Sequence, residues 1–260
     1  MSYTTIQFAI EDRIARITFA RPEKRNAIST AMILDLLRAF EETEASGARL
    51  LILTGEGKTF CAGMDLENLR SLVDQPQEEH LVNSRRMARL FRWIYTFPVP
   101  VIAAVNGAAI AGGCGIATLA DFTLAVPEAK FGYTEVKIGF LPALVSVFLR
   151  RQIGEKLSRE LLLTGKVIEA QEAYRLGLVN EIVQPTNLPD RVHELAASLL
   201  TVSPSSVART KRLLSASEEK SLDADLELAI AANAEIRTTP DFREGITAFL
   251  EKRDPKWSKE

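Results

Sequence analysis

The sequence is poor in the residues from which disulfide frameworks and metal centres are built. Its 260 residues include two cysteines, Cys61 and Cys114, and two histidines, His80 and His193. Two distant cysteines supply neither a disulfide framework nor a cysteine-rich zinc site. The histidines lack the spacing of a helical zinc motif, which argues against a metal hydrolase. We therefore expect a reducing environment and no metal site.

Long apolar runs and an excess of either charge are also missing. Lysines and arginines number 32 against 34 aspartates and glutamates, so the net charge of -2 gives no general attraction to nucleic acid or to an anionic membrane. No stretch has the length of a membrane span. Residues 1–19 alternate charged and apolar side chains, unlike a secretory signal. We expect a cytoplasmic protein in which any anion site is local.

Recurring strand and helix patterns predict an α/β fold. The composition, 47% hydrophobic and 25% charged, is typical of a globular protein. Two alternating apolar segments predict a hairpin, and a helix with one buried face follows from its N-cap Ser29. Three apolar runs predict further strands, and from about residue 155 the pattern is helical with little strand. The expected strands are residues 6–10, 14–19, 50–55, 99–105 and 122–126.

Two adjacent glycines stand between a predicted strand and a predicted helix. Residues 99–105 end at a tight turn, and Gly112 and Gly113 follow just before the next helical segment. The first N–H groups of a helix have no partner within it, so they can stabilise an oxygen that acquires negative charge. Close packing of a helix on a sheet also needs small residues, and that explanation is favoured on this feature alone. The spacing matches neither a P-loop nor a dinucleotide fingerprint.

A second candidate loop follows the predicted strand of residues 50–55. There, residues 62–65 can direct backbone N–H groups into a cleft. Asp65 can equally cap a helix that begins at Leu66, and such a cap would hold the amide of Met64 in place. The two interpretations are compatible, so this loop alone does not decide the function.

The third candidate segment places one carboxylate in apolar surroundings. Glu135 lies within FGYTEVKIGFLP, residues 131–142. Burial there would raise the pKa of Glu135 toward neutrality, which suits a group that both takes and gives a proton. The alternative is a salt bridge from Glu135 to Lys137 or another cation, and it is favoured when this segment is considered alone.

Together and in this order, the three segments resemble the crotonase, or enoyl-CoA hydratase/isomerase, family. The resemblance extends over nearly the whole chain, and it is the combination that is specific. The matching segments are RPEKRNAIS (residues 21–29), TFCAGMDL (59–66), PVIAAVNGAAIAGGCGIATLADFTLA (100–125), AKFGYTEVKIGFLP (129–142) and LTGKVIEAQEAYRLGLVNEIV (163–183).

This resemblance implies a crotonase-like spiral of ββα units with a C-terminal helical region that builds trimers, commonly paired into hexamers. We accordingly divide the chain into residues 1–195, a ββα core with a CoA-thioester site, and residues 196–260, a helical region for oligomerisation. The implied ligand is an acyl-CoA. Because coenzyme A is then part of the substrate, no separate cofactor is expected.

The resemblance also implies the roles of individual residues. The backbone amides of Met64 and Gly112 would hold the thioester oxygen, and Glu135 would act as the acid/base. Two fixed N–H donors stabilise such an oxyanion without reorganisation, and losing one costs about a hundredfold or more in rate. The implied CoA and substrate contacts are Lys24, Arg25, Ala27, Ala62, Asp65, Leu66 and Gly113. Exposed basic residues such as Lys24 and Arg25 need no such role.

One position departs from the best-known pattern of the family. Typical enoyl-CoA hydratases carry two catalytic glutamates; Glu135 matches the second, and Gly115 stands at the first. A single carboxylate must therefore serve where two usually share the activation of water.

The single glutamate leaves two activities open. Residues 134–154, TEVKIGFLPALVSVFLRRQIG, are similar to bacterial 3-methylglutaconyl-CoA hydratases of leucine catabolism, which interconvert that compound and 3-hydroxy-3-methylglutaryl-CoA. The alternative is an enoyl-CoA delta isomerase, in which Glu135 alone moves a proton between carbons. The sequence identifies no residue that would recognise a distal carboxylate.

An arginine-rich segment, SRRMARLFRWIY (residues 84–95), raises a third possibility of RNA binding or non-catalytic docking. The same segment fits an amphipathic helix whose arginines face solvent, and this interpretation is favoured because the overall charge shows no nucleic-acid footprint. The expected buried stripe is Leu81, Leu90, Phe91, Ile94 and Tyr95. Cys114 is expected to be a small core thiol, and His193 to lie on a surface helix.

Overall fold

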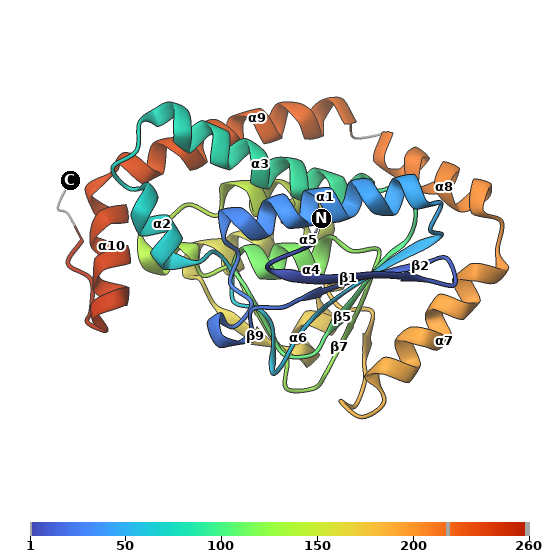
Figure 1. Cartoon of the computed structure of the whole chain (residues 1–260). Coiled ribbons are helices and arrows are strands. Elements are labelled where there is room, and N and C mark those ends of the chain that lie inside the picture. The colour runs from blue at the N-terminus through green and yellow to red at the C-terminus, as the bar shows by residue number, and fades with distance from the viewer. Residues whose placement is uncertain (1, 217–218, 258–260) are drawn as a thin grey trace.

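The computed structural model describes residues 2–216 and 219–257, and in them the chain builds two sheets in alternation (Figure 1). The larger sheet has the strand order β1-β2-β3-β5-β7-β10, and the smaller has the order β4-β6-β8-β9. The strands of the larger sheet are β1 (Ile6–Glu11), β2 (Ile14–Phe19), β3 (Leu50–Gly55), β5 (Val101–Val105), β7 (Phe122–Ala125) and β10 (Glu181–Ile182). Those of the smaller are β4 (Thr59–Cys61), β6 (Ala108–Ile110), β8 (Lys130–Gly132) and β9 (Val167–Glu169).

The helices occupy the connections and most of the C-terminal quarter of the chain. The α-helices are α1 (Thr30–Ser46), α2 (Leu66–Leu72), α3 (Gln77–Thr96), α4 (Gly112–Leu119), α5 (Ala143–Thr164), α6 (Ala170–Arg175), α7 (Leu188–Thr201), α8 (Pro204–Ala216), α9 (Glu219–Glu235) and α10 (Pro240–Glu251). Three short 3-10 helices are η1 (Pro22–Lys24), η2 (Glu135–Ile138) and η3 (Ile236–Thr238).

The N-terminal elements form as their local patterns predict. β1 and β2 pair antiparallel over their full length. Ser29 caps α1, because its hydroxyl accepts a hydrogen bond of 3.2 Å from the N–H of Met32. The predicted apolar face of α1 is buried, from Met32 to Phe40.

A ββα unit then repeats along the chain. In each repeat one strand joins the larger sheet, the next joins the smaller sheet, and a helix follows: β3 and β4 precede α2, β5 and β6 precede α4, and β7 and β8 precede η2 and α5. Successive repeats pair in parallel in both sheets. The predicted crotonase-like α/β spiral with C-terminal helices is therefore confirmed.

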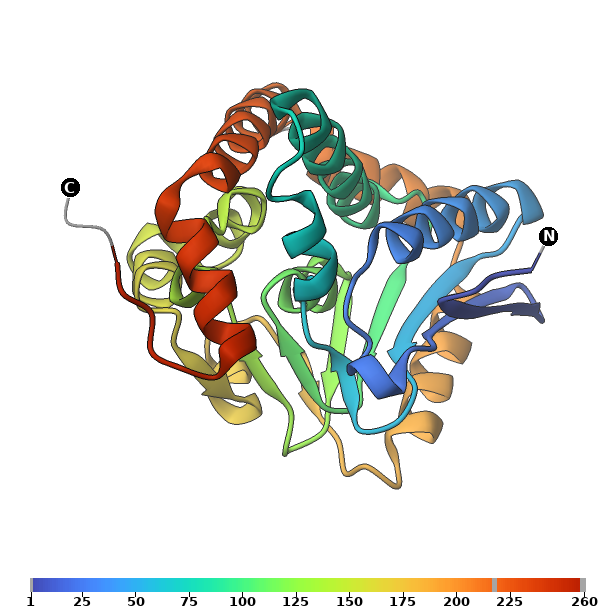
Figure 2. The same ribbon diagram turned by 60° about the vertical axis from the view of Figure 1, so that its left-hand side comes forward.

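Helices cover the strands from two sides. In Figure 1, α1, α3 and α9 lie above the strands, while α7 lies at the lower right and contacts β3, β5 and β7. The C-terminal helix α10 returns to lie next to α2 at one end of the molecule (Figure 2). There Phe242 and Ile246 of α10 form a small apolar cluster with Leu69 of α2 and Phe140. The end of the chain is thus packed against elements from its first half.

The boundary expected between residues 195 and 196 falls within α7. Beyond it, the described residues of the C-terminal region are in helices or their connections, although the short strands β9 and β10 interrupt the helical pattern that begins near residue 155. Among the described residues, no helix combines the length and apolar character needed to cross a membrane.

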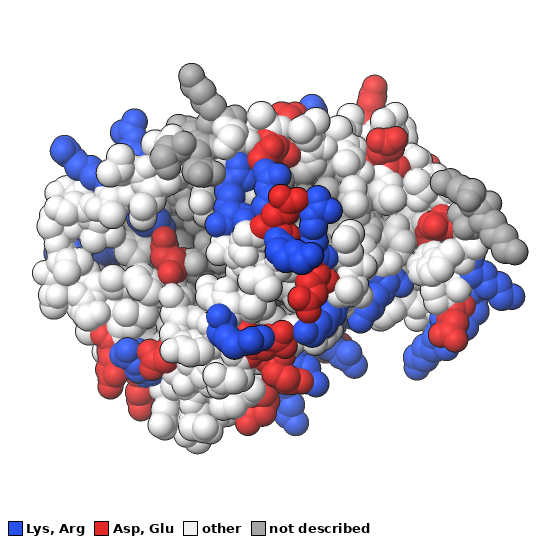
Figure 3. Space-filling view, turned by 180° about the vertical axis from the view of Figure 1, so that it is seen from behind, with Lys and Arg blue, Asp and Glu red and all other residues white. Residues whose placement is uncertain are grey.

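The arginine-rich segment lies on α3, with its apolar residues turned inward. Leu90, Phe91 and Ile94 are buried as expected, whereas Leu81 and Tyr95 are half-buried. Two of the arginines form ion pairs with acidic residues, Arg89 with Glu41 at 3.1 Å and Arg92 with Asp223 at 2.8 Å. On the face of the molecule seen in Figure 3, basic and acidic side chains are likewise interspersed.

Candidate active site

The three sequence segments predicted to form the site meet at one edge of the smaller sheet. β4, β6 and β8 are parallel neighbours, so their carboxyl ends lie together. Met64 follows β4, Gly112 follows β6 and Glu135 follows β8, each within three residues of its strand. The ββα repeat therefore brings together residues that are 71 positions apart in sequence, counting from 64 to 135.

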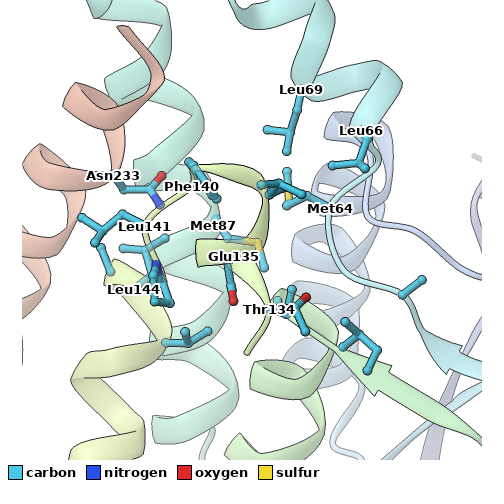
Figure 4. Close-up of a pocket in the computed structure, with 18 of the residues that line it drawn as sticks. Met64, Leu66, Leu69, Met87, Thr134, Glu135, Phe140, Leu141, Leu144 and Asn233 are labelled. Carbon is cyan, nitrogen blue, oxygen red and sulfur yellow. The ribbon is translucent and has the colours of Figure 1, made fainter. Parts of the chain in front are cut away.

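A cavity of about 280 Å³ lies at this edge. Six predicted site residues line it: Arg25, Ala62, Met64, Leu66, Gly112 and Glu135. In Figure 4, Glu135 lies between Met64 and Leu66 on one side and Leu141, Leu144 and Asn233 on the other. The wall is mostly apolar, and it includes Ile33, Leu69, Met87, Phe91, Ile110, Ile138 and Val145.

The backbone around Met64 leaves its amide available. Met64 forms a parallel bridge with Ile28, carried by the Ile28 N–H to the Gly63 carbonyl at 2.7 Å and the Asp65 N–H to the Ile28 carbonyl at 2.9 Å. In a parallel bridge the middle residue takes no part in the two bonds, so the amide of Met64 points away from Ile28. On that other side Gly63 lies against Ala111, because a Cβ on Gly63 would stand 2.9 Å from the Ala111 Cβ.

Gly112 is the first residue of α4, and its amide has no partner within the helix. The preceding residue, Ala111, has φ 51° and ψ -125°, a backbone conformation that costs about 1–3 kcal/mol in a residue with a Cβ. The Ala111 N–H donates to the Gly132 carbonyl at 2.6 Å, which holds this turn on β8. The strained turn sets the direction in which the Gly112 amide points. Two amides at one end of a cavity can hold an oxyanion.

The two glycines at the start of α4 serve different purposes. A Cβ on Gly113 would lie 2.3 Å from the Cys61 carbonyl oxygen, so α4 packs on β4 too closely for any larger residue. A Cβ on Gly112 would make only ordinary contacts, the nearest at 3.4 Å with Met87. The steric explanation therefore applies to Gly113, and it does not account for Gly112, which lines the cavity.

Glu135 is the only carboxyl-bearing residue among the described residues that line the cavity. It begins η2, is 7% exposed, and its Oε2 atom has no hydrogen-bond partner. Burial raises the pKa of Glu135 from 4.5 to about 7, as the sequence predicts, and no cation in the described part of the chain opposes that shift. The alternative of a salt bridge to Lys137 is not found there. Such a carboxyl can accept and return a proton near neutral pH.

The position of the missing second glutamate is filled by apolar side chains. A Cβ on Gly115 would stand 2.8 Å from Val145 and 3.1 Å from Phe91. Both of these residues line the cavity. The absence of a carboxylate at Gly115 is therefore accompanied by packing that leaves no room for one.

Four of the predicted contact residues lie outside the cavity wall: Lys24, Ala27, Asp65 and Gly113. Lys24 is ion-paired with Glu67 at 2.7 Å. Asp65 caps α2 by accepting from the N–H groups of Glu67 and Asn68. Arg21 also contacts Asp65 at 2.9 Å and Ala27 at 2.5 Å, which ties the loop of residues 21–27 to the loop that carries Met64.

Asp65 is held in its charged form by these partners. Burial acts to raise the pKa of Asp65, but the hydrogen bond from Arg21 and those from the backbone outweigh it, and the pKa is lowered. The helix-cap interpretation of Asp65 is confirmed, and its role is to fix the loop.

The cavity also contains residues that the sequence did not indicate. Asn83 comes from α3, whereas Asn233, Arg237 and Phe249 come from the C-terminal region that was assigned to oligomerisation. An arginine and an asparagine in an Ala-rich helical stretch carry no recognisable motif. Only the return of the chain end over α3 and η2 places them at the site.

The remaining reactive side chains form no second centre in the residues that the structure describes. Burial raises the pKa values of Cys61 and Cys114 to about 12, so both are inert core thiols at neutral pH, as expected for Cys114. His193 is exposed on α7, as expected. No cluster of His, Cys, Asp and Glu suited to a metal ion occurs in residues 2–216 and 219–257.

A buried carboxyl with a pKa of about 7, beside two residues that follow parallel strands of one sheet, makes a site suited to chemistry at an enolisable carbonyl compound. Comparison with known proteins identifies the family. Residues 9–260 match the family model described as enoyl-CoA hydratase/isomerase, and the chain belongs to this family.

Individual relatives agree with this assignment. A Thermus thermophilus protein provisionally named an enoyl-CoA hydratase is 46% identical over 245 residues, which cover 94% of this chain and 97% of the relative. The crotonyl-CoA hydratase of Syntrophomonas wolfei is 36% identical, with 97% of each chain covered. The crystal structure of an enoyl-CoA hydratase/isomerase from Xanthobacter autotrophicus superposes with a TM-score of 0.89 at 29% identity and covers 97% of this chain and 98% of that one.

Proposed function

We propose that the protein is an enoyl-CoA hydratase that reversibly adds water to an α,β-unsaturated acyl-CoA, with 3-methylglutaconyl-CoA and 3-hydroxy-3-methylglutaryl-CoA as the expected pair. The observation that carries this proposal is the buried Glu135 carboxyl, which faces an apolar cavity together with the amides of Met64 and Gly112. The names of the relatives support the reaction class. The residue similarity in segment 134–154 supports the acyl group.

In the proposed mechanism, the thioester oxygen accepts hydrogen bonds from the Met64 and Gly112 amides. The Glu135 carboxylate takes a proton from water, and the hydroxide oxygen forms a bond to the β-carbon. The electron pair of the C=C bond moves to the thioester oxygen, where the amides stabilise the negative charge. Protonation of the α-carbon, by Glu135 or by solvent, then completes the addition. Dehydration follows the same steps in reverse.

The coenzyme A portion is proposed to lie along the rim formed by residues 24–27 and 62–66. Arg25, Ala62 and Leu66 line the cavity, and the Arg21 contacts hold the two loops together. Lys24 is 43% exposed in its side chain and is therefore free to exchange Glu67 for a phosphate. Ala27, Asp65 and Gly113 act in this proposal by positioning the backbone.

An enoyl-CoA delta isomerase is the second candidate, and the packing at Gly115 favours it. Val145 and Phe91 occupy the space where a second carboxylate would bind water. An isomerase needs one carboxyl that removes a proton and returns it to another carbon, and Glu135 alone meets that need.

Mass spectrometry in heavy-oxygen water separates the two activities. The purified protein is incubated with 3-methylglutaconyl-CoA and, separately, with a 3-enoyl-CoA, and Glu135→Gln serves as the control. Uptake of labelled oxygen by the first substrate, absent in the control, is the expected result. Migration of the double bond in the second substrate without oxygen uptake would favour the isomerase, and turnover of neither would contradict both proposals.

We further propose that copies of this chain assemble as trimers through exposed leucines of the C-terminal half, and that trimers pair into hexamers. Leu213 of α8 is 73% exposed, and Leu163 of α5 and Leu228 of α9 are each 72% exposed. Leu163 and Leu228 flank a groove of about 500 Å³. Helix α8 has no buried residue of its own. Exposed leucines beside a partly apolar groove are what a self-association interface would cover.

A further inference from the structure

Arg237 is a buried cation in the cavity wall whose donors are not satisfied by the protein. It lies in η3 and is 3% exposed. Its Nη2 atom donates to the Asn233 side-chain oxygen at 3.1 Å, but Nε and Nη1 have no hydrogen-bond partner. Burying a charge without an opposite charge is costly. A buried guanidinium that has no carboxylate partner in the described part of the chain and two unsatisfied donor atoms is therefore a candidate site for an anionic ligand.

The groups around Arg237 do not neutralise it. Burial lowers the pKa of the Arg237 guanidinium to about 10, which leaves it charged at neutral pH. Asn233 already accepts a second hydrogen bond from the Ser84 hydroxyl at 2.9 Å. The two ring nitrogens of His80 also lack partners. The pKa of His80 is lowered, first by burial and then by the charges of Arg237 and Arg243. No carboxylate among the described residues pairs with Arg237.

The Arg237 guanidinium donates to Asn233 at 3.1 Å and therefore shares its part of the cavity wall. Figure 4 shows Asn233, to which Arg237 is bonded, and Thr134 on opposite sides of Glu135. The guanidinium also lies over the Phe140 ring, 5.5 Å from its centre. An acyl chain whose carbonyl is held at Met64 and Gly112 and whose reacting carbons lie at Glu135 would point its far end toward Arg237 and Asn233.

We propose that Arg237 binds a carboxylate at the distal end of the acyl group, so that the protein prefers CoA esters of dicarboxylic acids over neutral acyl-CoAs. This inference rests on the proposed function, because it assumes that the thioester lies between Met64, Gly112 and Glu135. Asn83 and Asn233 supply further polar groups to the same part of the wall. A carboxylate would satisfy the free donors of Arg237 and compensate its charge.

Equilibrium binding of saturated acyl-CoAs tests the inference without requiring turnover. Calorimetry compares glutaryl-CoA with pentanoyl-CoA, which has the same number of acyl carbons and no second carboxylate, on the full-length protein. The wild type is expected to bind glutaryl-CoA at least about tenfold more tightly. Arg237→Met is expected to remove this preference while binding pentanoyl-CoA as tightly as the wild type. Equal binding of the two ligands by the wild type would overturn the inference.

Thermal unfolding of Arg237→Met separates recognition from a structural role. Methionine fills similar volume without a buried charge, so its melting temperature is expected to equal or exceed that of the wild type. A clear loss of melting temperature together with retained ligand preference would show that Arg237 is structural. Arg237→Lys is the second variant, since it keeps the charge and is expected to retain part of the preference.

Glu135→Gln keeps the test independent of the proposed function. This variant is expected to lose turnover and to retain the preference for glutaryl-CoA. If the wild type selects glutaryl-CoA but turns over no enoyl-CoA, the proposed function fails and the role of Arg237 stands. If the wild type hydrates crotonyl-CoA and glutaconyl-CoA with equal kcat/KM and binds the saturated pair equally, the function stands and this inference fails.

Discussion

Glu135 combines burial with the lack of a cationic partner among the described residues, and each of these has a measurable consequence. A carboxyl in water would be ionised at pH 7, whereas burial holds the pKa of Glu135 at about 7. Both protonation states are therefore populated near neutrality, which suits a group that takes a proton in one step and returns it in another.

The rate of hydration is expected to follow the ionisation of Glu135. Because the carboxylate form activates water, kcat/KM should rise with pH and level off above an inflection near 7. Glu135→Gln should lower kcat by about 10²–10⁴-fold and remove the inflection. Initial rates measured from pH 5 to 9 check this, and an unchanged profile in the variant would exclude Glu135 as the base.

Stability should depend on pH through the same residue. The folded-state pKa of Glu135 is raised above 4.5, so ionisation of the buried carboxyl opposes folding. The resulting loss of stability is absent below pH 4.5 and reaches its full size above pH 7. Relative to Glu135→Gln, the wild type should lose free energy of unfolding over this window, by at most about 3 kcal/mol. Urea unfolding of both proteins at pH 5 and pH 8 measures the difference, and a gap that does not change with pH would contradict the assignment.

The neighbours of Gly115 restrict the size of the side chain at this position. In Gly115→Glu the new side chain would overlap Val145 and Phe91, and we expect the free energy of unfolding to fall by about 1–3 kcal/mol. Combining it with Val145→Ala should recover part of that loss, because the closest contact, at 2.8 Å, is with Val145. Thermal unfolding of Gly115→Glu, Val145→Ala and the double variant tests the coupling, and additive losses would contradict it.

At the scale of the element, the first two residues of α4 have different surroundings. Its second residue, Gly113, allows the helix to approach β4, while its first residue, Gly112, lines the cavity. The strained turn at Ala111 directly precedes these two glycines, so the helix begins at the cavity wall.

Alanine substitutions at the two glycines are expected to have opposite effects. Gly112→Ala should leave the melting temperature unchanged or raise it, because its Cβ fits and alanine favours a helix, but it should lower kcat/KM by about tenfold or more by narrowing the oxyanion site. Gly113→Ala should be destabilised by about 1–3 kcal/mol, because its Cβ would collide with the Cys61 carbonyl. Full activity in Gly112→Ala would show that this amide is not used.

At the scale of the whole molecule, the C-terminal region contributes both to the surface and to the wall of the cavity. It carries exposed leucines on α8 and α9, and it also returns over the first half of the chain to complete the cavity with Asn233 and Arg237. The division of the chain into a core with the site and an appendage for oligomerisation stays a prediction, but the cavity already takes residues from both sides of that boundary.

Self-association is expected to depend on the leucines of the C-terminal half. Leu213→Glu combined with Leu228→Glu should convert a trimeric or hexameric species into monomers, because charged groups would replace apolar ones at the interface. Light scattering coupled to size exclusion measures the mass. Leu34→Glu on α1, where the leucine is 49% exposed, is the matched control and should leave the mass unchanged. A monomeric wild type, or an unchanged mass in the double variant, would contradict the proposed interface.

Local features were predictable because their causes lie within a few residues. The hairpin, the cap at Ser29, the cap at Asp65 and the buried face of α1 follow from periodicity and from side-chain hydrogen bonds to nearby amides. The raised pKa of Glu135 was anticipated because most residues of its segment are apolar or aromatic, although Lys137 left a salt bridge as the favoured alternative for that segment alone.

The tertiary structure alone decided what each candidate residue touches. It showed that Gly113 is closely packed whereas Gly112 has room for a Cβ, and that apolar side chains fill the space at Gly115. It also paired Lys24 with Glu67 and placed it outside the cavity wall. It also brought Arg237 to the same cavity as Glu135, a separation of 102 positions in sequence. Such contacts depend on how helices and sheets that are far apart in sequence pack together. The local pattern of residues along the chain therefore cannot predict them.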